Sequence, residues 1–284
     1  MGIHLSKNKQ YKELGNNNED NNNEQEINKE RKYYLPNDNE DVDRLHTAHF
    51  LTRYLYTSNF SSPIEQKCGP GTWLLDVAGN YMESCFIGID LEFEFPSEIK
   101  PKNLVFVQAD ILNGLPYNND EFYFVHQENM MHTLESDKWD FVISELVRIT
   151  KPGGYIELFE SSTSRKDIGP KFNEFLDAPS IRGVDMNITP RLPSMLQSHQ
   201  NICNVHKDLK HYTLGKNGGH AGVIHADIIK SLATSKLTSE TLSKDSGFSI
   251  EEYNKLIEDA FEEVNRTKCE MISNRIWAQK TVNQ

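Results

Sequence analysis

From Cys68 to Phe159, short apolar runs alternate with segments whose apolar residues recur at helical spacing. Parallel strands cannot be joined by a tight turn and need a crossover, usually a helix, so this alternation predicts a parallel sheet with helices on both faces. The strands are expected at residues 85–91, 104–109, 121–126 and 155–159, and the helices at 41–56, 72–81 and 137–149. The fold class predicted is therefore a doubly wound α/β fold with a mostly parallel sheet.

The pattern weakens after Ser161. Residues 205–214 have the composition of a strand, and residues 224–233 and 250–264 have helical spacing. Residues 269–278 fit either a last strand or an extension of the helix before them.

The N-terminal tail has a different composition. Residues 16–30 consist almost entirely of Asn, Glu, Asp, Gln and Lys, which bury too little apolar surface to offset their ordering entropy. Residues 1–32 are therefore expected to be disordered and dispensable for folding. The start of the chain, Met1 to Ser6, also fits the N-myristoylation pattern, in which Gly2 carries the acyl group, although a chance match is the alternative. One acyl chain gives only marginal, reversible membrane binding.

Composition excludes several classes of protein. The formal net charge is -12 and the pI is near 5.3, which disfavours binding to phosphate backbones, so no nucleic-acid partner is expected. No apolar run has the length of a membrane helix, and no secretory signal is recognised. No metal site is expected, because His46 and His49 lack a suitably spaced partner and the cysteines form no CxxC pair. The expected location is the cytoplasm, with the membrane surface if Gly2 is acylated and the nucleus as a further alternative.

A glycine-rich turn precedes the expected helix at residues 72–81. Gly69 and Gly71 would let backbone amides approach a ligand at the start of this helix. Asp90 ends the next strand. In nucleotide-binding units, an acidic side chain about 20 residues after the glycine turn binds the ribose hydroxyls, and Asp90 lies near this position. Asp110 ends the following strand, at the sheet edge where ligands of open α/β folds bind.

Four segments together resemble the successive motifs of class I S-adenosylmethionine-dependent methyltransferases: CGPGTWLLDVA, FIGIDLE, FVQADILNGLPYNNDEFYFVH and ELVRITKPGGYIEL. The resemblance covers residues 41–160. The later segments HYTLGKNGGHAG and NRIWAQK are similar to those of a fungal branch of this family, related to methyltransferases that influence secondary metabolism.

The resemblance implies a Rossmann-like fold, S-adenosylmethionine as cofactor, and methyl transfer to a small-molecule or protein acceptor that the sequence does not identify. It also assigns expected roles. Gly69 and Gly71 would face the amino-acid part of the cofactor, and Asp90 would hold the ribose. The remaining assignments are Asp110 and Ile111 beside the adenine, His126 and Gln127 as catalytic candidates lining the reaction pocket, and Tyr34 and His49 covering the cofactor.

The expected organisation follows from these roles. Residues 1–32 form the tail, 33–60 a lid helix and 61–160 the cofactor-binding core, while 161–284 complete the sheet and cover the acceptor site. An NAD dehydrogenase is disfavoured, because its third glycine would fall at Leu74. No GxSxG motif suggests a hydrolase. The alternative from another class is a binding or regulatory module that keeps the fold without the reaction.

The sequence departs from the family pattern immediately before Cys68. In the family, a buried strand leads into the glycine turn, but here residues 61–67 read SSPIEQK and contain only one large apolar residue, Ile64. In one interpretation the strand survives in degenerate form, with Glu65 at the family's acidic position. In the other, a block of about ten residues, the length of a strand and its entry turn, is missing. Either interpretation predicts impaired cofactor binding, and the missing block also predicts weak stability and little or no methyl transfer.

Overall fold

The computed structural model describes residues 2–8, 34–36, 39–63, 72–91 and 100–282. Within these ranges the strands form one seven-stranded sheet in the order β3-β2-β1-β4-β5-β7-β6. The strands are β1 (Gly2–Asn8), β2 (Ser84–Asp90), β3 (Leu104–Gln108), β4 (Phe122–Glu128), β5 (Thr150–Thr163), β6 (Ile202–Thr213) and β7 (Glu270–Lys280). The pairings make β2 to β6 run in one direction and β1 and β7 in the other. The sheet is therefore mixed, with two parallel and four antiparallel pairs, and five of its seven strands share one direction, in rough agreement with the prediction of a mostly parallel sheet.

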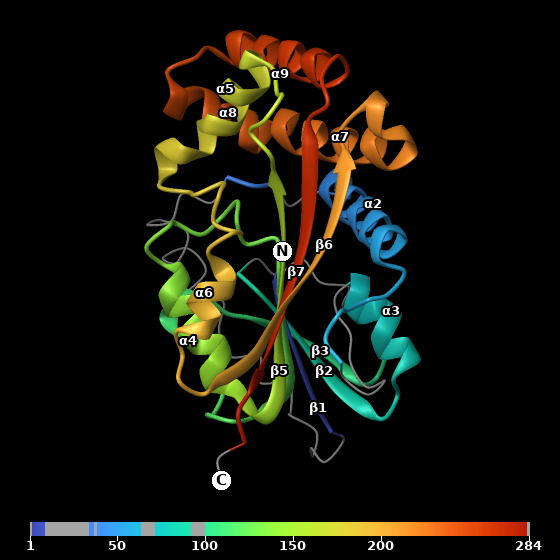
Figure 1. Ribbon diagram of the computed structural model, residues 1–284, viewed down its shortest axis with the longest axis vertical. Helices are drawn as coiled ribbons and strands as arrows, with labels where there is room; N and C mark the ends of the chain where they lie inside the picture. The colour runs from blue at the N-terminus through green and yellow to red at the C-terminus, as the bar shows by residue number, and fades with distance from the viewer. Residues whose placement is uncertain (1, 9–33, 37–38, 64–71, 92–99, 283–284) are drawn as a thin grey trace.

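Helices cover both faces of the sheet, as predicted (Figure 1). On one face lie α2 (Asn39–Tyr56) and α3 (Thr72–Asn80), and on the other lie α4 (Trp139–Ile149) and α6 (Leu192–Gln197). A helical layer beyond one end of β5, β6 and β7 contains α5 (Pro170–Asp177), α7 (Gly219–Thr234), α8 (Lys236–Ser246) and α9 (Ile250–Val264). Short 3-10 turns are η1 (Ile111–Asn113), η2 (Ala178–Arg182) and η3 (Lys216–Gly218). Among the described residues, no helix combines the length and apolar character needed to cross a membrane.

The strand β1 is the main departure from the sequence-based expectations. Residues 2–8 were expected to be disordered, but they pair with β2 on one side and with β4 on the other, both antiparallel. That part of the expectation is wrong, because Ile3 and Leu5 alternate with polar residues and bury their side chains to 2% and 1% exposure. The remainder of the expected tail, residues 9–32, lies outside the described residues, as does the segment directly before Cys68.

Three apolar clusters hold these layers together. One lies between the sheet and α4 and contains Ile3 and Leu5 of β1 beside Trp139. A second lies under α3, on the opposite face of the sheet. The third lies among the C-terminal helices and includes Tyr34 and Leu35. The first residues of the chain therefore belong to the same core as the central strands.

Several boundaries differ from those expected. The helix α2 begins at Asn39, so Asp41 lies in its first turn, where it forms an ion pair with Arg44 at 2.6 Å. The strand β5 was expected from residue 155 but begins at Thr150. Its pairing with β4 has a register shift between Phe122 and Phe124, and Gly153 on β5 has a φ of 80°. Residues 270–280 form the strand β7, which settles the alternative left open by the sequence.

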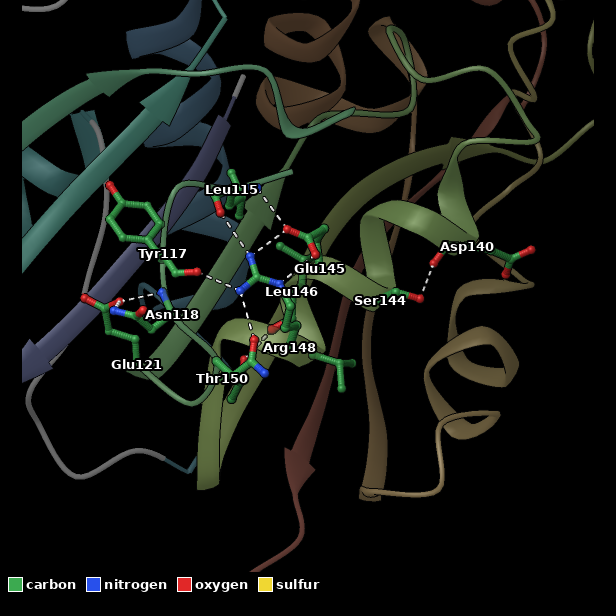
Figure 2. Close-up of polar contacts among 12 residues, drawn as sticks. Leu115, Tyr117, Asn118, Glu121, Asp140, Ser144, Glu145, Leu146, Arg148 and Thr150 are labelled. Atoms are coloured by element: carbon green, nitrogen blue, oxygen red, sulfur yellow. Dashed lines mark hydrogen bonds and ion pairs between the residues drawn. The ribbon is translucent and has the colours of Figure 1, made fainter. Parts of the chain in front are cut away.

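A hydrogen-bonded network fixes the connection between β3 and β4 (Figure 2). The guanidinium of Arg148 on α4 donates to the backbone carbonyls of Leu115, at 3.0 Å, and Tyr117, at 2.6 Å. The same group makes a bidentate contact with the carboxylate of Glu145, at 2.7 and 2.8 Å. Glu145 in turn accepts the backbone N–H of Leu115 at 2.9 Å. The loop that follows Asp110 is thus anchored to α4 by one ion pair.

Candidate active site

The carboxyl ends of β2 and β3 place Asp90 and Asp110 on adjacent strands. Asp90 pairs in register with Gln108, and its backbone carbonyl accepts the N–H of Ala109 at 3.0 Å. The Asp90 side chain is half-buried and accepts the backbone N–H of Leu91 at 2.7 Å. The two aspartates predicted from the sequence therefore lie at the same edge of the sheet.

Asp110 also has a structural role. Its carboxylate caps η1 by accepting the backbone N–H of Leu112 at 2.9 Å. Ile111, the next residue, is buried in the core beneath this edge. These contacts fix the backbone on the β3 side of the edge, and the predicted adenine contacts of Asp110 and Ile111 stay predictions.

The two catalytic candidates lie on β4, and both side chains are buried. The imidazole of His126 lies between two carboxylates, with Nε2 3.7 Å from Glu128 and Nδ1 3.6 Å from Glu157. Its ring also stacks on His4 of β1, with the ring centroids 5.8 Å apart. Burial would lower the pKa of His126, but the two carboxylates outweigh burial and raise it.

Gln127 donates a 2.6 Å hydrogen bond to Glu160 on β5.

Glu157 connects this cluster to the segment that leads into the glycine turn. Its carboxylate accepts the backbone N–H groups of Ser61 and Ser62, at 2.9 and 2.8 Å. Arg275 on β7 donates to the carbonyl of Ser58 at 3.1 Å and so fixes the same connector upstream. The connector is therefore held on β5 and β7, whereas the central position of the sheet belongs to β1. Gly69 and Gly71 themselves lie outside the described residues.

Comparison with known proteins matches the family model described as a methyltransferase domain to residues 64–154. This range contains the glycine turn, Asp90, Asp110 and β4. Residues 64–154 therefore carry a methyltransferase domain of the kind that the sequence motifs indicated. The Rossmann-like methyltransferase fold expected from the sequence is thereby confirmed.

Two curated proteins are similar to this chain. One is the N-methyltransferase verN of Clonostachys rogersoniana, 29% identical over 163 residues, which are 52% of this chain and 57% of that protein. The other is the secondary metabolism regulator laeA of Coprinopsis cinerea, 26% identical over 143 residues, which are 45% of this chain and 35% of that protein. The chain therefore matches 57% of the length of the first relative and 35% of the length of the second.

Solved structures also resemble this chain, at low sequence identity. The YcgJ protein of Bacillus subtilis is 15% identical with a TM-score of 0.48, and the alignment covers 84% of this chain and 100% of that one. Phosphoethanolamine N-methyltransferase 2 of Haemonchus contortus, in complex with phosphomonomethylethanolamine and S-adenosylhomocysteine, is 12% identical with a TM-score of 0.47 and coverages of 85% and 59%.

Tyr34 links the loop after β4 to the C-terminal helical layer. Its hydroxyl donates to the backbone carbonyl of His132 at 2.7 Å, and its own carbonyl accepts the hydroxyl of Thr238 at 2.8 Å. The guanidinium of Arg182 lies 5.0 Å from the centre of the Tyr34 ring. His49, on α2, is half-buried with its ring 5.3 Å from that of Phe50. The lid roles of both residues stay predictions.

Glu160 is a residue that the sequence analysis missed. It lies on β5 with 1% exposure and accepts the backbone N–H groups of Met130 and Met131, at 2.8 and 3.2 Å, beside the bond from Gln127. It therefore shapes the loop after β4. Glu157, within the otherwise apolar run of residues 155–159, and Glu160, directly after it, were the available signal, because a buried carboxylate needs partners. Among the described residues, no group of three or more His, Cys, Asp or Glu side chains is arranged to hold a metal ion.

Glu160 predicts a pH dependence of the stability of this chain. Burial raises the pKa of its carboxyl group from 4.5 to about 8, although the three donated hydrogen bonds oppose this. Between these two values the folded state keeps a proton that the unfolded state has lost. The free energy of unfolding should therefore fall as the pH rises through this window, by at most about 1.4 kcal/mol per pH unit.

Glu160→Gln cannot ionise and should lack this decline. Urea unfolding of both proteins at about pH 5 and about pH 8.5 measures the effect, and the variant should gain on the parent at the higher pH. Glu240→Gln, at an exposed position on α8, is the matched control. An unchanged difference between Glu160→Gln and the parent at the two pH values would contradict the assigned pKa.

Proposed function

We propose that this chain binds S-adenosylmethionine and transfers its methyl group to a nucleophilic acceptor. The observation that carries the proposal is the juxtaposition of Asp90 and Asp110 at the carboxyl ends of two adjacent parallel strands, inside the range matched by the methyltransferase domain. Ligands of open α/β sheets bind at this edge. A half-buried carboxylate such as that of Asp90 suits the vicinal hydroxyls of a ribose, since each hydroxyl can donate to one oxygen.

The cofactor, when bound, supplies a sulfonium with a methyl group that is activated toward nucleophilic displacement. The protein then has to orient the acceptor and exclude water. The described residues suited to this task are those that order the loop after β4, namely Glu160, Gln127 and Tyr34. Similarity to an N-methyltransferase favours a nitrogen atom as the acceptor.

The connector held by Glu157 suggests that cofactor affinity is impaired. In the family pattern the glycine turn continues a central strand, whereas here Ser61 and Ser62 lead toward it from β5. A strand that runs directly into the turn restricts it before the ligand arrives, whereas the anchors at Ser61 and Ser62 lie several residues before the glycines and leave more of that ordering to binding. We therefore propose weaker cofactor binding than a continuous central strand would give.

Asp90→Ala should weaken binding of S-adenosylhomocysteine roughly 10- to 100-fold, because charge-assisted hydrogen bonds contribute about 1.5–3 kcal/mol. Isothermal titration calorimetry on the purified chain measures this directly. Asp227→Ala, the same change at an exposed position of α7, is the control and should leave the affinity unchanged. Equal affinity of parent and Asp90→Ala would remove the ribose assignment. Cofactor binding by a chain that methylates no offered amine would favour the non-catalytic alternative.

A further inference from the structure

One short segment, residues 2–8, lies at the centre of the sheet between β2 and β4. The space between these two strands is called the groove below. Ile3 to Asn8 pair with Ile89 to Ser84 of β2, and Gly2 to Ser6 pair with Glu128 to Phe124 of β4. The segment therefore uses backbone groups on both of its edges. A strand in this position satisfies the facing edges of two strands at once.

Side chains fix the register of this segment. Leu5 lies between Ile87 and Val125, and Ile3 lies beside Ile89, all within the cluster under α4. A shift by one residue would turn His4 into this apolar layer, since successive side chains point to opposite faces. The groove therefore selects an extended peptide with apolar residues at alternate positions.

A side chain near each end of the segment contacts a glutamate. Near its carboxyl end, Lys7 Nζ lies 2.9 Å from Glu121, with side-chain exposures of only 8% and 14%, and 5.2 Å from the centre of the Phe122 ring. Near its amino end, His4 Nε2 lies 3.5 Å from Glu128. A cation in a nearly buried ion pair is a specific requirement, because removing either partner leaves the other charge uncompensated.

The chain connectivity sets this strand apart from its neighbours. Both partner strands are remote in sequence, and the next described residue after Asn8 is Tyr34, which belongs to the separate cluster of the C-terminal helices. Every contact of the segment named above is made with β2, β4, the residues that flank them or the core. These contacts would be the same if the segment were a separate peptide.

We propose that the groove between β2 and β4 is a binding site for one extended peptide strand, and that residues 2–8 are its exchangeable ligand. Recognition is by strand addition, in which main-chain hydrogen bonds give affinity and alternate side chains give specificity. In the intact chain the ligand is present at the millimolar effective concentration typical of a tethered segment, so it outcompetes free peptide.

The test uses the full chain with a site-specific protease sequence inserted after Asn22. After cleavage, a fluorescent peptide of residues 2–10 is added and the mixture is separated by size exclusion. The labelled peptide should co-elute with the cleaved protein and be displaced by its unlabelled form. A Leu5→Asp peptide should not bind, and a Lys7→Glu peptide should bind roughly tenfold more weakly or worse. The uncut chain is the control and should take up little peptide.

Two outcomes would overturn the proposal. One is binding of the Leu5→Asp peptide as tightly as the parent peptide. The other is an unchanged melting temperature after the N-terminal fragment has been removed. Should the cleaved protein unfold on losing its fragment, recovery on adding the peptide supports the site and failure to recover rejects it. Hydrogen exchange on the uncut chain gives a second measurement, since the amides of residues 3–7 should be protected and rapid exchange there would contradict the proposal.

Discussion

Replacing Leu5 by aspartate should lower the free energy of unfolding by about 3–5 kcal/mol, because it puts a carboxylate into an apolar layer without a partner. Leu5 is 1% exposed between the apolar side chains of Ile87 and Val125. A loss of this size is a large part of the net stability of about 5–15 kcal/mol that a typical domain has. Urea unfolding of the full chain, followed by far-UV circular dichroism, measures it.

The comparison for Leu5→Asp is Val282→Asp, which makes a similar change at a side chain with 69% exposure and should alter stability by less than about 0.5 kcal/mol. If Leu5→Asp were as stable as this control, β1 would contribute nothing to the fold. The expectation that the N-terminal tail is dispensable for folding would then be correct for residues 2–8 as well.

Arg148→Ala should destabilise the chain by about 2–4 kcal/mol. The substitution removes the donors to the carbonyls of Leu115 and Tyr117 and leaves the carboxylate of Glu145 without its cation. Arg148 holds Glu145 charged, because their hydrogen bonds lower the pKa of this carboxyl group. The same unfolding assay measures the loss.

Arg266→Ala is the control for Arg148→Ala, since Arg266 forms only an exposed ion pair with Glu262 on the same helical face. Exposed pairs of this kind contribute about 0–1 kcal/mol. Similar losses in the two variants would mean that the network in Figure 2 does not anchor the loop. A second effect is expected in Arg148→Ala: calorimetry should show weaker cofactor binding, since this loop follows Asp110.

The elements predicted correctly are those whose sequence pattern matches their environment. The strands β2 and β4 are mostly buried and contain the short apolar runs CFI and FYFV. The helix α9 begins at the expected residue because Ser249 and Glu252 form a capping box and its apolar residues repeat at helical spacing. In these segments local preference and tertiary packing agree.

The missed elements depend on distant partners. The strand β1 has only two large apolar residues, and its pairing with β2 and β4 cannot be read from a local pattern. The helix α8 carries mostly polar residues. In the candidate site, Asp90 and Asp110 were predictable because each ends a strand, whereas the roles of Glu157 and Glu160 follow from donors brought to them by residues 61–62 and 130–131.

The position of β1 also has a consequence for biosynthesis. Residues 2–8 leave the ribosome before both of their partners, and β4 ends only at Glu128. A domain that is completed during translation must therefore keep its first strand unpaired until more than a hundred further residues have emerged. Pairings of such high sequence separation are slow to form. Any acylation of Gly2 belongs to this interval, because afterwards Gly2 is paired with Glu128 inside the sheet.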